Sequence, residues 1–187
     1  MLVLVYGTLY AQVSITLPLA IKDAGLRNSD FGYVIAVNGI LIVFGQPLTL
    51  GIMTRVSRRY TLPAGIFGVA LGLAGFGLCH QPWQFGLSVA LLTAGEIFTA
   101  GSFQSIIASL APAHMRGRYG GALGLAWGAS GLLAPLVGAS VFAASPGALW
   151  IGCLLVGTAT AAGQGWLIGA IDRRQASQAI RQRPQPR

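Results

Sequence analysis

One charged side chain stands inside a long apolar stretch and is the first candidate for chemistry. Glu96 is the only Asp, Glu, Lys or Arg between residues 85 and 108. An ionised group at the centre of a membrane-spanning helix costs roughly 3 kcal/mol. On a helix, Thr93 and Thr99 flank it at three-residue spacing and form a polar stripe with it. We interpret Glu96 as a protonatable group on a path for protons and substrate. The alternative is a hydrogen-bonded residue that only packs helices.

Polar side chains also recur in two other apolar stretches. Thr8, Gln12 and Thr16 are spaced four residues apart, which places them on one helical face, with Gln12 near the centre of its stretch. Asn38 and Gln46 occupy the next stretch. We expect these side chains to line a wet cavity together with Glu96. Hydrogen bonding between helices is the simpler reading for Gln12, Asn38 and Gln46.

No cofactor or metal site is predicted. Lys22 is the only lysine and follows Ile21, so no phosphate-binding GxxxxGK[ST] loop can be written. Any energy for work must therefore come from a gradient or from another chain. Cys79 and Cys153 show neither CxxC nor Cys/His spacing, which favours simple packing.

A GxSG tetrapeptide at residues 128–131 resembles the serine nucleophile motif of rhomboid intramembrane proteases. That chemistry needs a histidine base on a later span, but His80 and His114 both precede Ser130. We therefore interpret Ser130 as a small packing residue and predict that the chain is not an enzyme.

The composition is that of a membrane protein. Of the 187 residues, 54% are hydrophobic and 9% are charged, and the mean hydropathy is +0.68. Soluble domains carry about 25% charged residues. The net charge of +8 does not indicate nucleic-acid binding, because the basic residues fall in the gaps between apolar runs instead of covering a folded surface.

Six apolar segments are long enough to cross a bilayer as helices, and none shows the two-residue alternation of a barrel strand. The sequence thus predicts an all-α membrane protein that embeds in a lipid bilayer, followed by a disordered tail at 172–187. The predicted spans are residues 2–21, 31–53, 60–79, 85–108, 119–143 and 148–171.

Arginines concentrate in alternate gaps. Ten of the twelve basic residues fall on one side of the predicted membrane. Short cytoplasmic loops retain Lys and Arg, so both termini are expected in the cytoplasm. The ten residues are Arg55, Arg58, Arg59, Arg116, Arg118, Arg173, Arg174, Arg181, Arg183 and Arg187.

Glycines recur at four-residue spacing, a pattern that lets helix backbones approach closely in membranes. The clearest series is Gly120, Gly124 and Gly128, and shorter ones are Gly68 with Gly72 and Gly165 with Gly169. We expect these glycines to sit at tight helix contacts.

Four passages together resemble the C-terminal half of a major facilitator superfamily transporter, most closely the bacterial drug:proton antiporters. The likeness covers nearly the whole chain. The passages are residues 31–33 with Asn38 and 46–47; residues 55–59; residues 95–96; and residues 115–121 leading to 134–138.

The resemblance implies that these spans correspond to helices seven to twelve, arranged as two inverted three-helix repeats. It also implies a conformational role for the loop arginines, namely Arg55, Arg58, Arg59, Arg116 and Arg118. In that family, the loop between the second and third spans of each half carries a basic signature that acts as a conformational latch, and its acidic residue is missing here. Pro135 and Gly138 look like remnants of an antiporter motif whose other glycines are replaced by Ala134 and Ala139.

The function implied is secondary transport of a small molecule, with proton-coupled efflux by alternating access in a bacterial inner membrane. Six spans make half of such a machine, so the resemblance also implies a partner half with six further helices. An inactive or truncated half that serves only as a structural module is the alternative.

Overall fold

The computed structural model describes residues 1–53 and 56–181, except for the side chains at 50–53, 58, 101, 103–110, 113, 172 and 174–181. Every regular element in this part of the chain is a helix. The predicted all-α class is therefore confirmed.

The first predicted span is broken, which corrects the expectation of one helix over residues 2–21. It consists of α1 (Leu2–Tyr10), α2 (Gln12–Ile15) and α3 (Leu17–Asp23), with a bend of 40° before α3. Pro18 explains the break, because it has no N–H to donate to the carbonyl four residues earlier and its ring crowds that carbonyl.

The remaining spans begin and end within a few residues of the predicted bounds, with one exception. The helix α8 continues to Arg181, ten residues past the predicted boundary at 171, so much of the predicted disordered tail is helical. The elements are α4 (Asn28–Met53), α5 (Arg58–Gly75), η1 (Phe76–Leu78), α6 (Pro82–Leu110), η2 (Ala113–Met115), α7 (Arg116–Ala144) and α8 (Pro146–Arg181).

Four helices of the described chain, α4, α5, α7 and α8, are long and apolar enough to cross a membrane. The bent segment from α1 to α3 adds a fifth if it is one span. The helix α6 has 29 residues, and the side chains of residues 101 and 103–110 in it lie outside the described part of the chain. The structure thus shows four or five of the six predicted spans, and the sixth stays a prediction.

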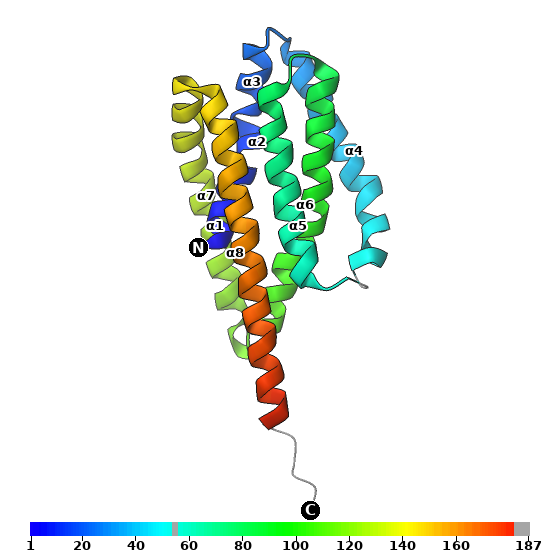
Figure 1. Ribbon diagram of the computed structural model, residues 1–187, viewed down its shortest axis with the longest axis vertical. Helices are drawn as coiled ribbons and strands as arrows, with labels where there is room; N and C mark the ends of the chain where they lie inside the picture. The colour runs from blue at the N-terminus through cyan, green and yellow to red at the C-terminus, as the bar shows by residue number, and fades with distance from the viewer. Residues whose placement is uncertain (54–55, 182–187) are drawn as a thin grey trace, which may run out of the picture.

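The helices form a bundle in which α5 packs between α6 and α8, α4 lies outside α6, and α1 packs against α7 (Figure 1). Glycines allow the closest approach, between α5 and α6. A Cβ on Gly72 would lie 2.6 Å from Leu92 Cβ, and one on Gly68 would lie 3.2 Å from Gly95 Cα. These two glycines behave as the sequence predicted.

The longer glycine series does not. At Gly120, Gly124 and Gly128 an added Cβ would meet nothing within 4 Å, so this face of α7 is open in the chain. Of the residues predicted to pack α7, Gly138 is buried against Gln12, whereas Pro135 is exposed.

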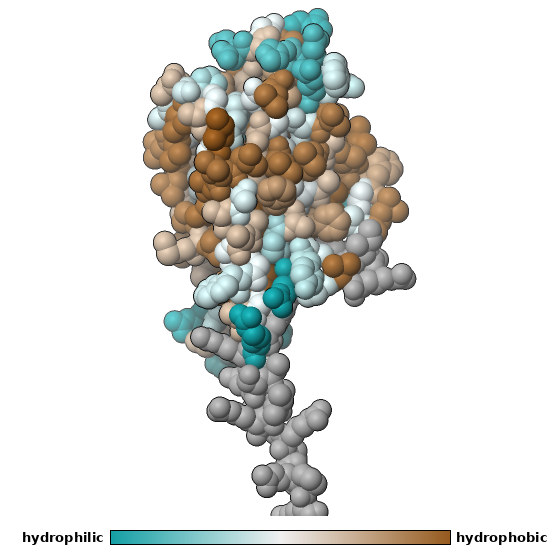
Figure 2. Space-filling view, in the orientation of Figure 1, coloured by the Kyte–Doolittle hydropathy of each residue, from teal (hydrophilic) through white to brown (hydrophobic). Residues whose placement is uncertain are grey.

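Hydrophobic side chains also cover much of the outer surface. Figure 2 shows a hydrophobic band across the middle of the molecule, with hydrophilic residues above and below it. Leu132, Leu136 and Trp166, for example, are 74%, 67% and 71% exposed. Exposed apolar side chains on this scale are disfavoured in water, so the band matches the hydrocarbon layer of a bilayer.

Candidate functional site

Glu96 lies half-buried on α6, and helices α1 and α4 each bind one of its carboxylate oxygens. Tyr10 donates a hydrogen bond of 2.5 Å to Oε1, and Nδ2 of Asn38 donates one of 3.0 Å to Oε2. Three helices that are distant in the sequence therefore meet at one carboxylate.

Asn38 is fixed by a second contact on α6. Its Nδ2 also donates to Thr93 Oγ1 at 2.9 Å, and the Thr93 hydroxyl in turn donates to the Val89 carbonyl at 2.7 Å. The two hydrogens of the amide thus have one acceptor each. This arrangement orients the amide so that it presents a donor, not an acceptor, to Glu96.

Thr99 extends the network toward the start of α1. Its hydroxyl donates to the Glu96 backbone carbonyl at 2.9 Å, which leaves its oxygen to accept the hydrogen bond from Tyr6 at 2.7 Å. Thr93 and Thr99 are 0% and 1% exposed. The predicted polar stripe of α6 is therefore an internal hydrogen-bonded network.

Aromatic rings surround the carboxylate on its open side. The rings of Tyr6 and Tyr10 stack with centroids 6.2 Å apart, and Trp127 of α7 meets both edge-on at 6.0 and 6.3 Å. They enclose a cavity of about 160 Å³ lined by Tyr6, Tyr10, Glu96, Thr99, Ala100, Leu123 and Trp127. A carboxylate that shares a cavity with aromatic rings is suited to hold either a proton or a cationic group.

Gln12 does not join this site, which corrects the expectation that it would share a cavity with Glu96. Its Nε2 donates to the carbonyls of Thr8 at 3.1 Å and Ala134 at 3.2 Å, so the side chain binds α7 instead of facing α6. Its Oε1 is buried without a hydrogen-bond partner and lies against Gly138.

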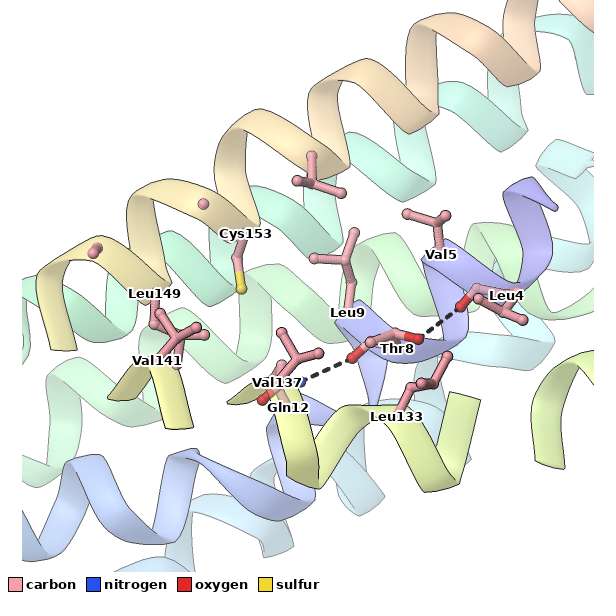
Figure 3. Close-up of a pocket in the computed structure, with 13 residues that line it drawn as sticks. Leu4, Val5, Thr8, Leu9, Gln12, Leu133, Val137, Val141, Leu149 and Cys153 are labelled. Atoms are coloured by element: carbon pink, nitrogen blue, oxygen red, sulfur yellow. Dashed lines mark hydrogen bonds between the residues drawn. The ribbon is translucent and has the colours of Figure 1, made fainter. Parts of the chain in front are cut away.

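A second cavity adjoins Gln12. It measures about 340 Å³ and lies between α1, α7 and α8, and Figure 3 shows mostly aliphatic side chains around it, with Leu9, Val137 and Cys153 among them. Because its walls are apolar and Gln12 is bound to backbone carbonyls, this cavity offers packing space and little chemistry.

The sequence profile of the Major Facilitator Superfamily matches residues 1–135. This match covers more than half of the chain. The chain belongs to the major facilitator superfamily.

Curated relatives in the superfamily have transport-related names. The chain is 28% identical over 109 residues, 58% of its length, to a "Na(+), Li(+), K(+)/H(+) antiporter" of Planococcus maritimus. It is 29% identical to "Multidrug resistance protein MdtH" of Cronobacter sakazakii over 66% of its length, and 29% identical to "Multidrug resistance protein MdtG" of Enterobacter lignolyticus over 71%. The matched segments cover only 26%, 31% and 32% of these relatives. The resemblance to a membrane transporter family drawn from the sequence is confirmed.

Thr16 and Gln46, two other predicted site residues, lie away from the hydrogen-bonded network around Glu96. Thr16 is buried at the bend and donates to the Gln12 carbonyl at 3.0 Å. Gln46 is exposed on α4, and its backbone carbonyl accepts a hydrogen bond from Thr49. Of the polar residues singled out on the first two spans, only Asn38 contacts Glu96.

The loop arginines occupy one end of the bundle. Arg59 is exposed at the start of α5, and Arg116 and Arg118 are exposed at the start of α7. Arg55 and the side chain of Arg58 lie outside the described residues. The conformational role that the resemblance implies for these residues stays a prediction.

Ser130 is a packing residue in this structure. Its hydroxyl is shared between the carbonyls of Ala126 at 2.7 Å and Leu4 at 2.9 Å, and it rests against Gly7. It thereby joins α7 to α1, next to Trp127.

Sequence reasoning missed the three aromatic residues of the site. Tyr6 and Tyr10 lie within an apolar run and Trp127 within a glycine-rich span, so composition does not set them apart. A signal was present, since Tyr6 and Tyr10 are four residues apart and must share a helical face. Their face is the one that meets Glu96.

Proposed function

We propose that this chain is half of a secondary transporter that exchanges protons for a small amphipathic substrate by alternating access. One observation carries the proposal: a carboxylate held by Tyr10 and Asn38 also lines a cavity walled by aromatic rings. Intramembrane carboxylates of this kind are costly and usually mark a path for ions or substrate.

The chemistry of exchange follows from competition for Glu96. When ionised, the carboxylate attracts a positively charged group, and the rings of Tyr6, Tyr10 and Trp127 stabilise the same charge through their faces. When protonated, it loses that attraction and releases the group. Relatives named as a cation/proton antiporter and as multidrug resistance proteins support exchange of this type.

Alternating access requires a second half, and we propose that six further helices complete the transporter. Its docking would cover the open faces of α4 and α7, where Gly120, Gly124 and Gly128 leave room for close approach. Within this scheme the chain forms two inverted three-helix repeats and keeps both termini in the cytoplasm, as the arginine distribution predicts.

Replacement of Glu96 tests the proposal. The gene is expressed with its native flanking sequence, and proton movement is followed with a pH-sensitive dye in inverted membrane vesicles upon addition of Na⁺, Li⁺, K⁺ or lipophilic cations. Glu96→Gln should abolish substrate-induced proton release, whereas Glu96→Asp should retain part of it. Asp23→Asn is the matched control, because Asp23 is an exposed carboxylate at the end of α3.

Two outcomes would contradict the proposal. If wild-type vesicles release protons and the Glu96→Gln vesicles release them equally, Glu96 is not the coupling group. If wild-type vesicles respond to no compound while the protein is present at normal level, the inactive structural module is favoured.

A further inference from the structure

The outer face of α5 and α8 contains a trough that is separate from the carboxylate site. It measures about 530 Å³ and is lined by Arg59, Tyr60, Pro63, Ala64, Phe67, Thr158, Ala161, Ala162, Gly165 and Trp166. Because α5 and α8 run antiparallel, Arg59 lies beside Gly169 and Pro63 beside Gly165. The trough therefore follows the helix axes.

Small residues make the floor of the trough and large ones make its walls. On α8, the missing side chain at Gly165 and the methyl of Ala161 leave the floor low. Tyr60 and Phe67, seven residues apart on α5, stand on one side, with 66% and 41% of their surfaces exposed. Trp166 of α8 stands on the other side. Two ridges thus flank a groove open to the surroundings of the bundle.

Chemical character changes along this groove in the order found across one leaflet of a membrane. The cation of Arg59 is at the end, the aromatic rings of Tyr60 and Trp166 come next, and Phe67 lies deeper. At 1.5 Å per residue, Arg59 and Phe67 are separated by about 12 Å. Tyr and Trp are the residues enriched at the level of lipid headgroups, and Arg prefers phosphate.

Arg59 places its charge at one end of the trough. Its guanidinium lies against α8, where a Cβ on Gly169 would be 3.3 Å from Cζ, and 5.9 Å from the centroid of the Tyr60 ring. Among the residues whose side chains are described, no acidic one lines the trough. A negative charge brought to this end therefore meets the cation of Arg59.

We propose that this trough is a binding site for an anionic phospholipid, with the phosphate at Arg59 and the upper part of one acyl chain between Phe67 and Trp166. The occupant is a lipid and not a soluble anion, because most of the lining surface is hydrocarbon. The site is independent of Glu96 and of the proposed transport cycle.

The experiment uses Trp166 as a reporter in the full chain. The protein is reconstituted in vesicles of phosphatidylcholine that contain increasing fractions of phosphatidylglycerol, with bromine on the acyl chains of one lipid or the other to quench tryptophan fluorescence. The Trp166 contribution is the difference between the wild-type chain and Trp166→Phe. The matched control is the same difference taken with Trp83→Phe, which removes an exposed tryptophan at the start of α6.

Phosphatidylglycerol should quench Trp166 with an apparent affinity about fivefold above that of phosphatidylcholine, the factor expected for one arginine at a membrane surface. Arg59→Gln should bring the ratio of the two apparent affinities close to one. Arg118→Gln, which removes the same charge from α7, should leave this ratio unchanged. Equal quenching by both lipids in the wild type, or loss of the preference in Arg118→Gln but not in Arg59→Gln, overturns the proposal.

A second variant tests the trough without changing charge. Ala162→Phe fills the groove at an exposed position of α8 and should reduce quenching of Trp166 by phosphatidylglycerol, while Ala159→Phe, exposed on the same helix outside the groove, should not. Inorganic phosphate added at constant ionic strength should not displace the lipid. Displacement by phosphate, or equal effects of the two phenylalanines, would show that the trough is not a lipid site.

Discussion

The Tyr10 hydroxyl donates its hydrogen bond to Glu96 across 86 positions of sequence, and so joins the broken first span to α6. This contact places a phenol between the carboxylate and the rings of Tyr6 and Trp127. Both Tyr10 and Glu96 are contacted by side chains from helices other than their own. The site therefore depends on the packing of three helices.

Removal of that hydroxyl should loosen the bundle. Tyr10→Phe leaves one oxygen of Glu96 without its donor, and hydrogen bonds between membrane helices contribute about 0.5 to 2 kcal/mol. We expect a lower unfolding temperature in detergent, measured by circular dichroism. Tyr33→Phe, at a tyrosine that is 64% exposed, is the control and should be neutral. Equal stabilities of the two variants would show that the Tyr10 contact contributes nothing.

Gly138 should tolerate no side chain while Gln12 is present. A Cβ at this position would overlap the Gln12 amide, so Gly138→Ala should destabilise the chain by about 1 to 3 kcal/mol, the usual range for overpacking. Gly128→Ala is the matched control. It adds a methyl to open space on the same helix and should be neutral or slightly stabilising.

The double variant Gln12→Ala, Gly138→Ala separates the clash from a general effect of alanine. If the two side chains compete for one space, the double variant should be more stable than the sum of the single effects predicts. Strict additivity in the measured free energies of unfolding would contradict the contact.

Replacement of Trp127 should weaken the response to cationic substrates. Trp127→Leu removes an aromatic face beside Glu96 and should weaken cation-induced proton release in vesicles several-fold, since a cation–π contact contributes about 1 to 2 kcal/mol when desolvated. Trp127→Phe should retain most of the response. Trp83→Leu, on an exposed tryptophan at the start of α6, is the control, and an equal loss in both leucine variants would argue against an aromatic site.

The sequence was enough to find the carboxylate and its neighbours on α6. An isolated charge in an apolar run stands out by composition alone, and helical spacing places Thr93 and Thr99 beside it. Asn38 was also found, because amides are rare at mid-depth. The helical class and most helix bounds follow in the same way from apolar runs of sufficient length.

What the sequence did not reveal depends on which helices become neighbours. Gln12 has the spacing of a cavity residue, yet it binds the Ala134 carbonyl because α1 packs against α7 at that level. The series from Gly120 to Gly128 has the pattern of a tight contact, but in the described part of the chain an added Cβ at these glycines would meet nothing within 4 Å. The spacing of residues along one helix indicates which face is suited to a contact. Only the fold shows which helix, if any, packs against that face.

The break in the first span gives the site a pivot. The segment from Thr16 to Tyr10 is about 9 Å long at helical rise, and it is joined to α3 through a junction weakened by Pro18. A rotation of about 10° there moves the phenol by about 1.5 Å, which is enough to open a hydrogen bond to the carboxylate while α3 stays in place. The same swing would break the hydrogen bonds that tie this segment to α7, from Gln12 to the Ala134 carbonyl and from Ser130 to the Leu4 carbonyl, so exposure of Glu96 is coupled to the contact between α1 and α7.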